Sequence, residues 1–284
     1  AENWWGRVDG GMEYSSGLYF AGFVGYGGRE GVYIPAAALD TAVRFPDFYK
    51  FYANASEAAK HGFVLHAESR LFEFVGDNQC VAYEWCGQGA LEGYWAVPQC
   101  RDQPGSCLEL ALAFPSWSLS RFEQMVKNAE LPFVAAYYGD RLLEATLAYA
   151  ADGHFVPYYW FEPDPYTNVV SSIRVAFPSH SFGCDVDNTL NPETGTISCD
   201  FTEIALVKMA GPRLQPGELS LPEATHVVHS FYISQSELQE LLAQHEATGG
   251  NFSSAELACL YLETHQDKVL QVVPYCLRHP IPLE

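Results

Sequence analysis

The chain has 284 residues, of which 48% are hydrophobic and 14% aromatic, so it can bury a large core and is not a disordered protein. Its 15 basic and 35 acidic residues give a formal net charge of −20, which repels nucleic acid and anionic lipid and slightly favours cationic small molecules. Solubility alone is the better explanation of this charge, because acidic secreted proteins need no cationic ligand. No apolar run of about 18 residues occurs, so no membrane span is expected.

The predicted elements alternate between strands and helices, which indicates an α/β fold. Capping signals predict helices that start at Ser120, Asp140, Ser234 and Ser253. Short β-branched or aromatic runs predict strands of a largely parallel sheet at 62–66, 154–160 and 173–177. The glycine-rich stretch 25–31 lacks the lysine and the helix of a phosphate-binding loop, and its glycines are expected to form a turn.

Eight cysteines lie in local groups without any C-x-x-C pair, which favours disulfides over a metal site. We expect Cys184 to pair with Cys199 and Cys259 with Cys276. The other four, Cys80, Cys86, Cys100 and Cys107, fall in a glycine- and proline-rich excursion at 76–107. The tripeptides that begin at Asn54 and Asn251 are N-glycosylation acceptors. Together these features indicate an extracellular or secretory-lumen protein, or a periplasmic one in a bacterium.

Motifs of the common catalytic and cofactor sites are absent from the sequence, so we expect no enzyme, no catalytic residue, no cofactor and no metal. A hydrolase without such a motif stays open as a weaker alternative. Aromatic residues instead stand next to loop-forming residues: Trp4, Tyr33, Tyr159, Trp160 and Tyr232. Rings of this kind around one pocket attract a quaternary ammonium group, although most aromatic residues serve packing.

Several of these stretches resemble the substrate-binding proteins of glycine betaine, proline betaine and choline ABC importers, which are type II periplasmic binding proteins. The stretch from Gly25 to Pro35 is similar to a family segment that ends in an aromatic residue, an aliphatic residue and proline. Tyr158-Tyr-Trp-Phe-Glu-Pro163 resembles the family's Tyr-Trp-x-Pro, with Phe161 inserted. Phe231-Tyr-Ile-Ser234 and Thr264-His-Gln-Asp-Lys-Val269 resemble its C-terminal region.

The resemblance implies a two-lobed α/β fold with a central cleft. Residues 1–61 and 174–284 would form lobe 1, and residues 62–173 would form lobe 2. Carried over by position, the family's aromatic cage falls on Trp4, Trp160 and Tyr232, with Tyr159 and Tyr33 beside it. The implied function is a non-catalytic module that binds a quaternary-ammonium compound such as glycine betaine or choline.

One departure from the family concerns the start of the chain. The family has a strand, a helix and a strand before the Glu-x-Trp motif, which here begins at Glu2. We therefore expect the first part of lobe 1 to be missing or to be supplied by another extracellular chain, as in a secreted eukaryotic relative. The partners expected are the small ligand and either a membrane transporter or that second chain. An alternative function is a structural glycoprotein subunit of an extracellular assembly.

Overall fold

The computed structural model describes residues 19–40, 46–76, 80, 83–87, 91, 93–118, 120–164, 171–181, 183–184, 191–214, 222–249 and 252–272. The chain forms two compact units. Of the described residues, those within 29–162 and 171–202 belong to unit 1, and those within 19–28, 163–164 and 203–272 belong to unit 2. These boundaries differ from the expected divisions near residues 61 and 174, so the lobes and their central cleft stay a prediction.

The predicted α/β class is confirmed, but the prediction of a largely parallel sheet is wrong. In unit 1 the strands follow the order β2-β4-β3-β5-β1-β6. Among the described strands, parallel pairing joins β3 to β4 and to β5, and all the other pairs are antiparallel. The strands are β1 (Tyr19–Pro35), β2 (Tyr94–Ala96), β3 (Leu108–Leu112), β4 (Phe133–Tyr137), β5 (Tyr158–Glu162), β6 (Ser172–Arg174) and β7 (Ile204–Ala210).

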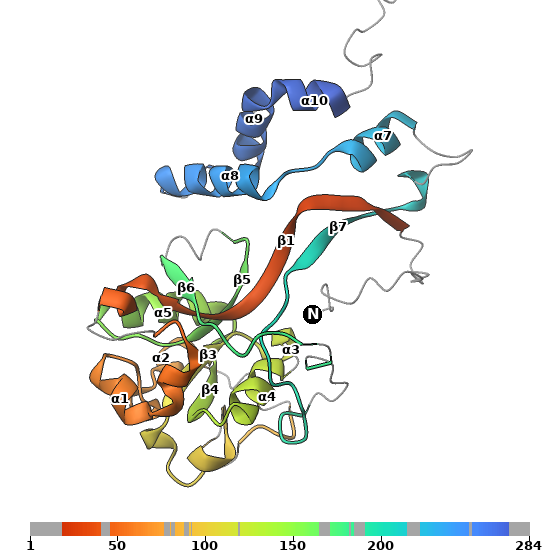
Figure 1. The fold of residues 1–284 in the computed structure, drawn as a ribbon. Helices are drawn as coiled ribbons and strands as arrows, with labels where there is room; N and C mark the ends of the chain where they lie inside the picture. Colours follow the sequence, from red (N-terminus) through yellow and green to blue (C-terminus); the bar gives the residue numbers. More distant parts are fainter. Residues whose placement is uncertain are drawn as a thin grey trace, which may run out of the picture. The chain divides into compact units, whose positions relative to one another are not determined.

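Helices follow or flank these strands (Figure 1). Those of unit 1 are α1 (Ala55–Lys60), α2 (Leu71–Phe74), α3 (Pro115–Ser118), α4 (Arg121–Asn128) and α5 (Leu142–Ala151). Those of unit 2 are α7 (Pro222–Ser230), α8 (Gln235–Ala247), α9 (Ser254–Thr264) and α10 (Gln266–Val272). Short 3-10 helices span Ala36–Asp40, Tyr49–Ala53, His66–Glu68, Pro98–Cys100, Pro104–Ser106, Gly139–Arg141 and Pro212–Leu214. No helix in these described parts is long and apolar enough to cross a membrane.

The helix starts predicted near Ser234 and Ser253 are confirmed with their caps. The backbone N–H of Glu256 donates to Ser253 Oγ over 3.3 Å, and Ser253 N donates back to the Glu256 carboxylate. The helix predicted after Ser120 is also confirmed, but its cap is wrong. Ser120 has a φ of 61° and makes no side-chain cap bond, so tertiary packing holds this helix start instead.

The turn predicted at residues 25–31 is wrong, because these residues lie inside the long strand β1. Up to Gly28 the strand pairs with β7 in unit 2, and from Arg29 it pairs with β5 and β6 in unit 1. The glycines make room for close neighbours: a Cβ on Gly25 would collide with the backbone of Ile233, and one on Gly31 with the guanidinium of Arg174. Glycine here serves close approach rather than chain reversal.

One other sequence prediction needs correction. Residues 62–66 do not form a strand, since only isolated bridges join Phe63 to Phe155 and Leu65 to Leu108. Periodicity failed there because a short apolar run does not reveal which partner strand it will find. The stretch 76–107, predicted as a disulfide-rich excursion, contains two disulfides and also contributes β2 to the sheet, with Trp95 only 1% exposed.

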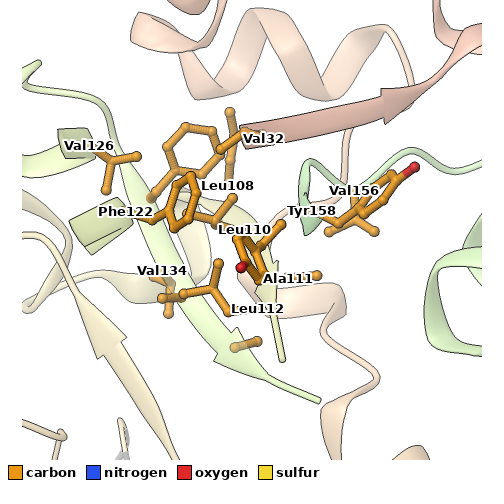
Figure 2. Packing of buried hydrophobic residues seen from close by; sticks show 14 of the residues in the cluster. Val32, Leu108, Leu110, Ala111, Leu112, Phe122, Val126, Val134, Val156 and Tyr158 are labelled. Atoms are coloured by element: carbon orange, nitrogen blue, oxygen red, sulfur yellow. The ribbon is translucent and has the colours of Figure 1, made fainter. Parts of the chain in front are cut away.

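The core of unit 1 lies on the central strands (Figure 2). All five residues of β3 are buried, because the strand is paired on both edges and covered on both faces. Its one charged residue, Glu109, accepts hydrogen bonds from Tyr138 Oη (2.5 Å) and Tyr149 Oη (3.2 Å). Helix α4 adds Phe122 and Val126 to this core.

The polar face of α4 holds the segment 191–197 through its backbone. Lys127 Nζ donates to the carbonyl oxygens of Pro192 (2.5 Å), Glu193 (3.0 Å) and Gly195 (3.0 Å). The backbone N–H of Ile197 donates to the side chain of buried Gln124 over 3.2 Å. The segment therefore lies so close to α4 that a Cβ on Gly195 would overlap the Gln124 amide.

We expect Gly195→Ala to lower the free energy of unfolding by about 1–3 kcal/mol, because the added methyl group must push α4 and the segment apart. Urea denaturation followed by circular dichroism measures the change. Gly76→Ala is the matched control, since a Cβ there meets no atom within 4 Å, and it should change stability by less than about 0.5 kcal/mol. Equal effects of the two substitutions would contradict the close packing described for Gly195.

Three disulfides occur in the described part of the chain. The expected pair Cys184–Cys199 is confirmed, and the other bonds are Cys80–Cys86 and Cys100–Cys107. Cys259 has a free, exposed thiol among the described residues. Its expected partner Cys276 lies outside them, so that pairing stays a prediction.

Candidate functional site

Two tryptophans of unit 1 lie just beyond the carboxyl end of β3. Trp160 is the third of the five residues of β5, and Trp117 lies in α3, which begins at Pro115 shortly after β3 ends at Leu112. The parallel register pairs Ala111 with Tyr158, so β5 begins where β3 ends. In open α/β sheets ligands usually bind beyond the carboxyl ends of parallel strands.

The rings at this edge form an aromatic cluster, which we define as Phe114, Trp117, Tyr159, Trp160 and Phe161. The Trp117 ring centroid lies 6.5 Å from Trp160 with planes inclined by 54°, and 6.3 Å from Tyr159 with planes inclined by 70°. Trp160 stacks on Phe161 at 5.2 Å and 10°, which leaves no room between those two rings. Both tryptophans are only partly buried, so their remaining faces can contact a ligand.

A buried carboxylate lies beside the cluster. Glu30 of β1 pairs with Phe161 of β5 and is 8% exposed. Its carboxylate accepts a hydrogen bond from Tyr159 Oη (3.2 Å) and faces Arg121 Nη1 (3.5 Å). Burial raises the pKa of Glu30 above its ordinary value, while Arg121, the Tyr159 hydrogen bond and Arg174 oppose that shift.

A second charged group supports the same part of β1. Arg174 of β6 forms two hydrogen bonds to the carboxylate of Asp200 and donates to the carbonyl oxygen of Glu30 over 3.2 Å. Arg29 Nη2 lies 3.6 Å from the same Asp200 carboxylate. The side chains of Arg174 and Asp200 are 13% and 8% exposed. This arrangement holds the backbone at Glu30 in place and makes the surroundings of the cluster polar on one side.

The structure distributes the predicted ligand-binding residues over different environments. Tyr159 and Trp160 belong to the aromatic cluster, although Tyr159 is only 4% exposed. Tyr33 is fully buried, with its ring centroid 6.2 Å from that of Tyr158. Tyr232 lies in unit 2, is 51% exposed and has the ammonium of Lys268 over its ring. Trp4 lies outside the described residues.

Sequence reasoning missed Trp117, Phe114 and Glu30. Phe114 and Trp117 flank Pro115 shortly after β3, but the local sequence does not show that β5 lies beside them. The burial of Glu30 had no local signal either, since a glutamate in a glycine-rich run is typical of an exposed turn.

Other kinds of site are not found in this part of the molecule. The described residues include no group of three or more His, Cys, Asp or Glu side chains that could hold a metal ion. Asn54, the described glycosylation acceptor, is exposed and caps α1, with its Oδ1 accepting a hydrogen bond from Glu57 N over 3.1 Å. Asn251 lies outside the described residues.

Comparison with known proteins gives matches among solved structures alone: no protein-family model and no curated protein matches the chain. Lactococcal OpuAC, crystallised in its closed-liganded conformation with glycine betaine, is 11% identical with a TM-score of 0.48, over 92% of this chain and 73% of OpuAC. The glycine betaine, L-proline ABC transporter binding protein ProX from Borrelia burgdorferi is 9% identical with a TM-score of 0.47, over 92% and 71% of the two chains.

An ABC-transporter choline binding protein in complex with choline is 10% identical with a TM-score of 0.44, over 89% of this chain and 65% of that protein. At these values the likenesses assign neither a fold family nor a ligand to this chain.

Proposed function

We propose that the chain is a non-catalytic module that binds a quaternary-ammonium compound such as glycine betaine or choline. The observation that carries this proposal is the inclined pair of partly buried indole rings, Trp117 and Trp160, just beyond the carboxyl end of β3. Inclined ring faces suit a trimethylammonium group, which has no hydrogen to donate and is held by its contact with π-electron density.

The rings, rather than a free charge, carry the proposal. The Glu30 carboxylate accepts a hydrogen bond from Tyr159, which is a member of the cluster, but it already faces the guanidinium of Arg121 at 3.5 Å. Glu30 and Arg121 therefore position the Tyr159 ring without leaving an unpaired charge for the ligand. The resemblance of residues 158–163 to a family segment that contains a cage tryptophan also supports the proposal. The resemblance also predicts Trp4 and Tyr232 as cage residues, but Tyr232 could take that role only if Lys268 left its ring.

The fold family and the setting are part of the proposal. We propose a type II periplasmic-binding-protein fold and an extracytoplasmic location, supported by three disulfides and an exposed glycosylation acceptor at Asn54. A membrane transporter, or a second extracellular chain that completes lobe 1, is the macromolecular partner that this reading predicts.

Isothermal titration of the chain with glycine betaine, choline and carnitine tests the function. We expect saturable binding of at least one of them, and we expect Trp160→Ala and Trp117→Ala each to weaken it about tenfold, because each removes one ring face from the ammonium group. Trp85→Ala is the matched control, since Trp85 packs against Tyr83 and Tyr137 instead, and its affinity should equal that of the unmodified chain. Absence of binding to all three compounds would refute the proposed function.

A further inference from the structure

Four segments of unit 2 meet around the ammonium group of Lys268. Lys268 belongs to α10, and Tyr232 precedes α8. Glu237 lies in the first turn of α8, and Tyr261 lies in α9. Tyr232 and Glu237 precede Tyr261 and Lys268 by at least 24 positions in the sequence, so the fold brings the two pairs together.

The ammonium group contacts two ring faces and a carboxylate at once. Lys268 Nζ is 3.9 Å from the centroid of Tyr232 and 5.9 Å from that of Tyr261. The same nitrogen donates to both carboxylate oxygens of Glu237, at 2.6 and 2.8 Å. The lysine side chain is 16% exposed and the glutamate side chain 17%, so water has little access to the pair.

This set of groups matches what an alkylammonium ligand requires. An aromatic face attracts a cation placed over it within about 6 Å, and a neighbouring carboxylate adds charge attraction. Burial raises the pKa of Glu237, but hydrogen bonds from Lys268 and from Ser234 outweigh it and bring the pKa down to about 2. The carboxylate is therefore ionised while Lys268 is in place.

We propose that Tyr232, Tyr261 and Glu237 form an alkylammonium site that Lys268 fills from within the chain, so that Tyr232 accepts an external methylated amine only when Lys268 is removed. The proposal goes beyond the function proposed for the aromatic cluster, because every group involved belongs to unit 2. It predicts that Tyr232 is not a free ring of the ligand cage. If the experiment below gives a negative result, the proposed ligand binding at Trp117 and Trp160 is not affected, because it is tested separately by titration.

His265 also faces the Glu237 carboxylate, so the experiment below has to take it into account. His265 Nε2 lies 3.6 Å from Glu237 Oε1, and its ring stacks on Tyr261 at 4.3 Å. A protonated histidine could replace the lysine ammonium, so the experiment is done at pH 8, where an ordinary histidine is neutral.

The test uses tetramethylammonium as the probe and the ring proton signals of Tyr232, assigned with Tyr232→Phe, as the readout. In the unmodified chain, addition of tetramethylammonium should leave these signals unchanged. In Lys268→Ala they should shift and reach saturation as the tetramethylammonium concentration rises. Lys50→Ala is the matched control. Lys50 Nζ also lies over a tyrosine ring, 6.0 Å from the Tyr49 centroid, but it forms no ion pair with a carboxylate among the described residues. Equal Tyr232 shifts in the unmodified chain and in Lys268→Ala, or none in either, would overturn the proposal.

A second measurement keeps the proposal testable if Lys268→Ala does not fold. In the unmodified chain the ε-methylene protons of Lys268 should resonate upfield of those of Lys60, since ring currents shield atoms held over an aromatic face. Tyr232→Leu should remove that upfield shift. Coincident Lys268 and Lys60 signals in the folded, unmodified chain would rule out the internal occupant.

Discussion

Asp200→Asn is expected to lower the free energy of unfolding by about 3 kcal/mol, as measured by urea denaturation at pH 7. The substitution removes a carboxylate that Arg174 holds with two hydrogen bonds and that Arg29 faces at 3.6 Å. Arg174 is mostly buried, so its guanidinium would lose its counter-charge without gaining water. The loss of one partner of such a pair costs more than the pair itself contributes.

A double-mutant cycle separates the pair from general effects of the substitution. Arg174→Met removes the buried cation and keeps a chain of similar length. In the Arg174→Met background, Asp200→Asn should cost less than half of what it costs alone, because no buried guanidinium is left unpaired. Glu144→Gln is the control. It breaks the ion pair between Glu144 and Arg141, two side chains that are each more than half exposed, and should lower the free energy of unfolding by less than about 1 kcal/mol. If Asp200→Asn lowered the free energy of unfolding by no more than Glu144→Gln does, the role of Asp200 as counter-charge to Arg174 would be contradicted.

Unit 1 should lose about 3 kcal/mol of stability between pH 4 and pH 8 through Glu123 alone. This side chain is fully buried, and burial raises its pKa from 4.5 to about 7 against the opposing hydrogen bond from Tyr137 Oη (2.6 Å). Because the folded state holds this proton more tightly than the unfolded state, the contribution is complete below pH 4.5. It is lost as the pH rises through 7.

Glu123→Gln should remove this part of the pH dependence, because its amide oxygen can still accept the Tyr137 hydrogen bond and no longer ionises. Denaturant midpoints at pH 4.5, 6 and 8 measure the effect. Glu84→Gln removes one negative charge from an exposed position of the same unit and should leave the slope almost unchanged, which controls for the net charge of −20. A Glu123→Gln variant with the slope of the unmodified chain would contradict the raised pKa.

Local signals in the sequence were sufficient for the helices near the C-terminus and for the fold class. The Ser253 and Glu256 pair predicted a helix start, and the structure forms both bonds of that cap. Such motifs are reliable because their atoms lie within one turn, so no distant partner is required. The pairing of Cys184 with Cys199 was predictable for a similar reason, since a short loop joins them.

The strands and the charged groups depended on distant partners. Glycines at 25–31 indicate a turn locally, but Arg174 and the paired strands keep those residues extended. Glu30, Glu109 and Glu123 lie buried because tyrosines from other elements donate to them. A sequence does not show which tyrosine will meet which carboxylate, so these groups could not be predicted.

Trp117, the second tryptophan of the candidate site, could not be predicted from the sequence for the same reason. Trp160 was predicted from a motif, whereas Trp117 meets it only because β3 and β5 are parallel neighbours. Strand order is a tertiary property that the local pattern around Trp117 does not contain.

The central claim, that the indoles of Trp117 and Trp160 contact a trimethylammonium group, is tested most directly by nuclear Overhauser effects from the bound ligand. With glycine betaine or choline in excess, whichever the titration shows to bind, the ligand's methyl protons should give cross-peaks to the indole protons of both tryptophans. The same peaks should be absent for Trp85. A bound ligand whose methyl protons show no cross-peak to Trp117 or Trp160 would contradict the claim.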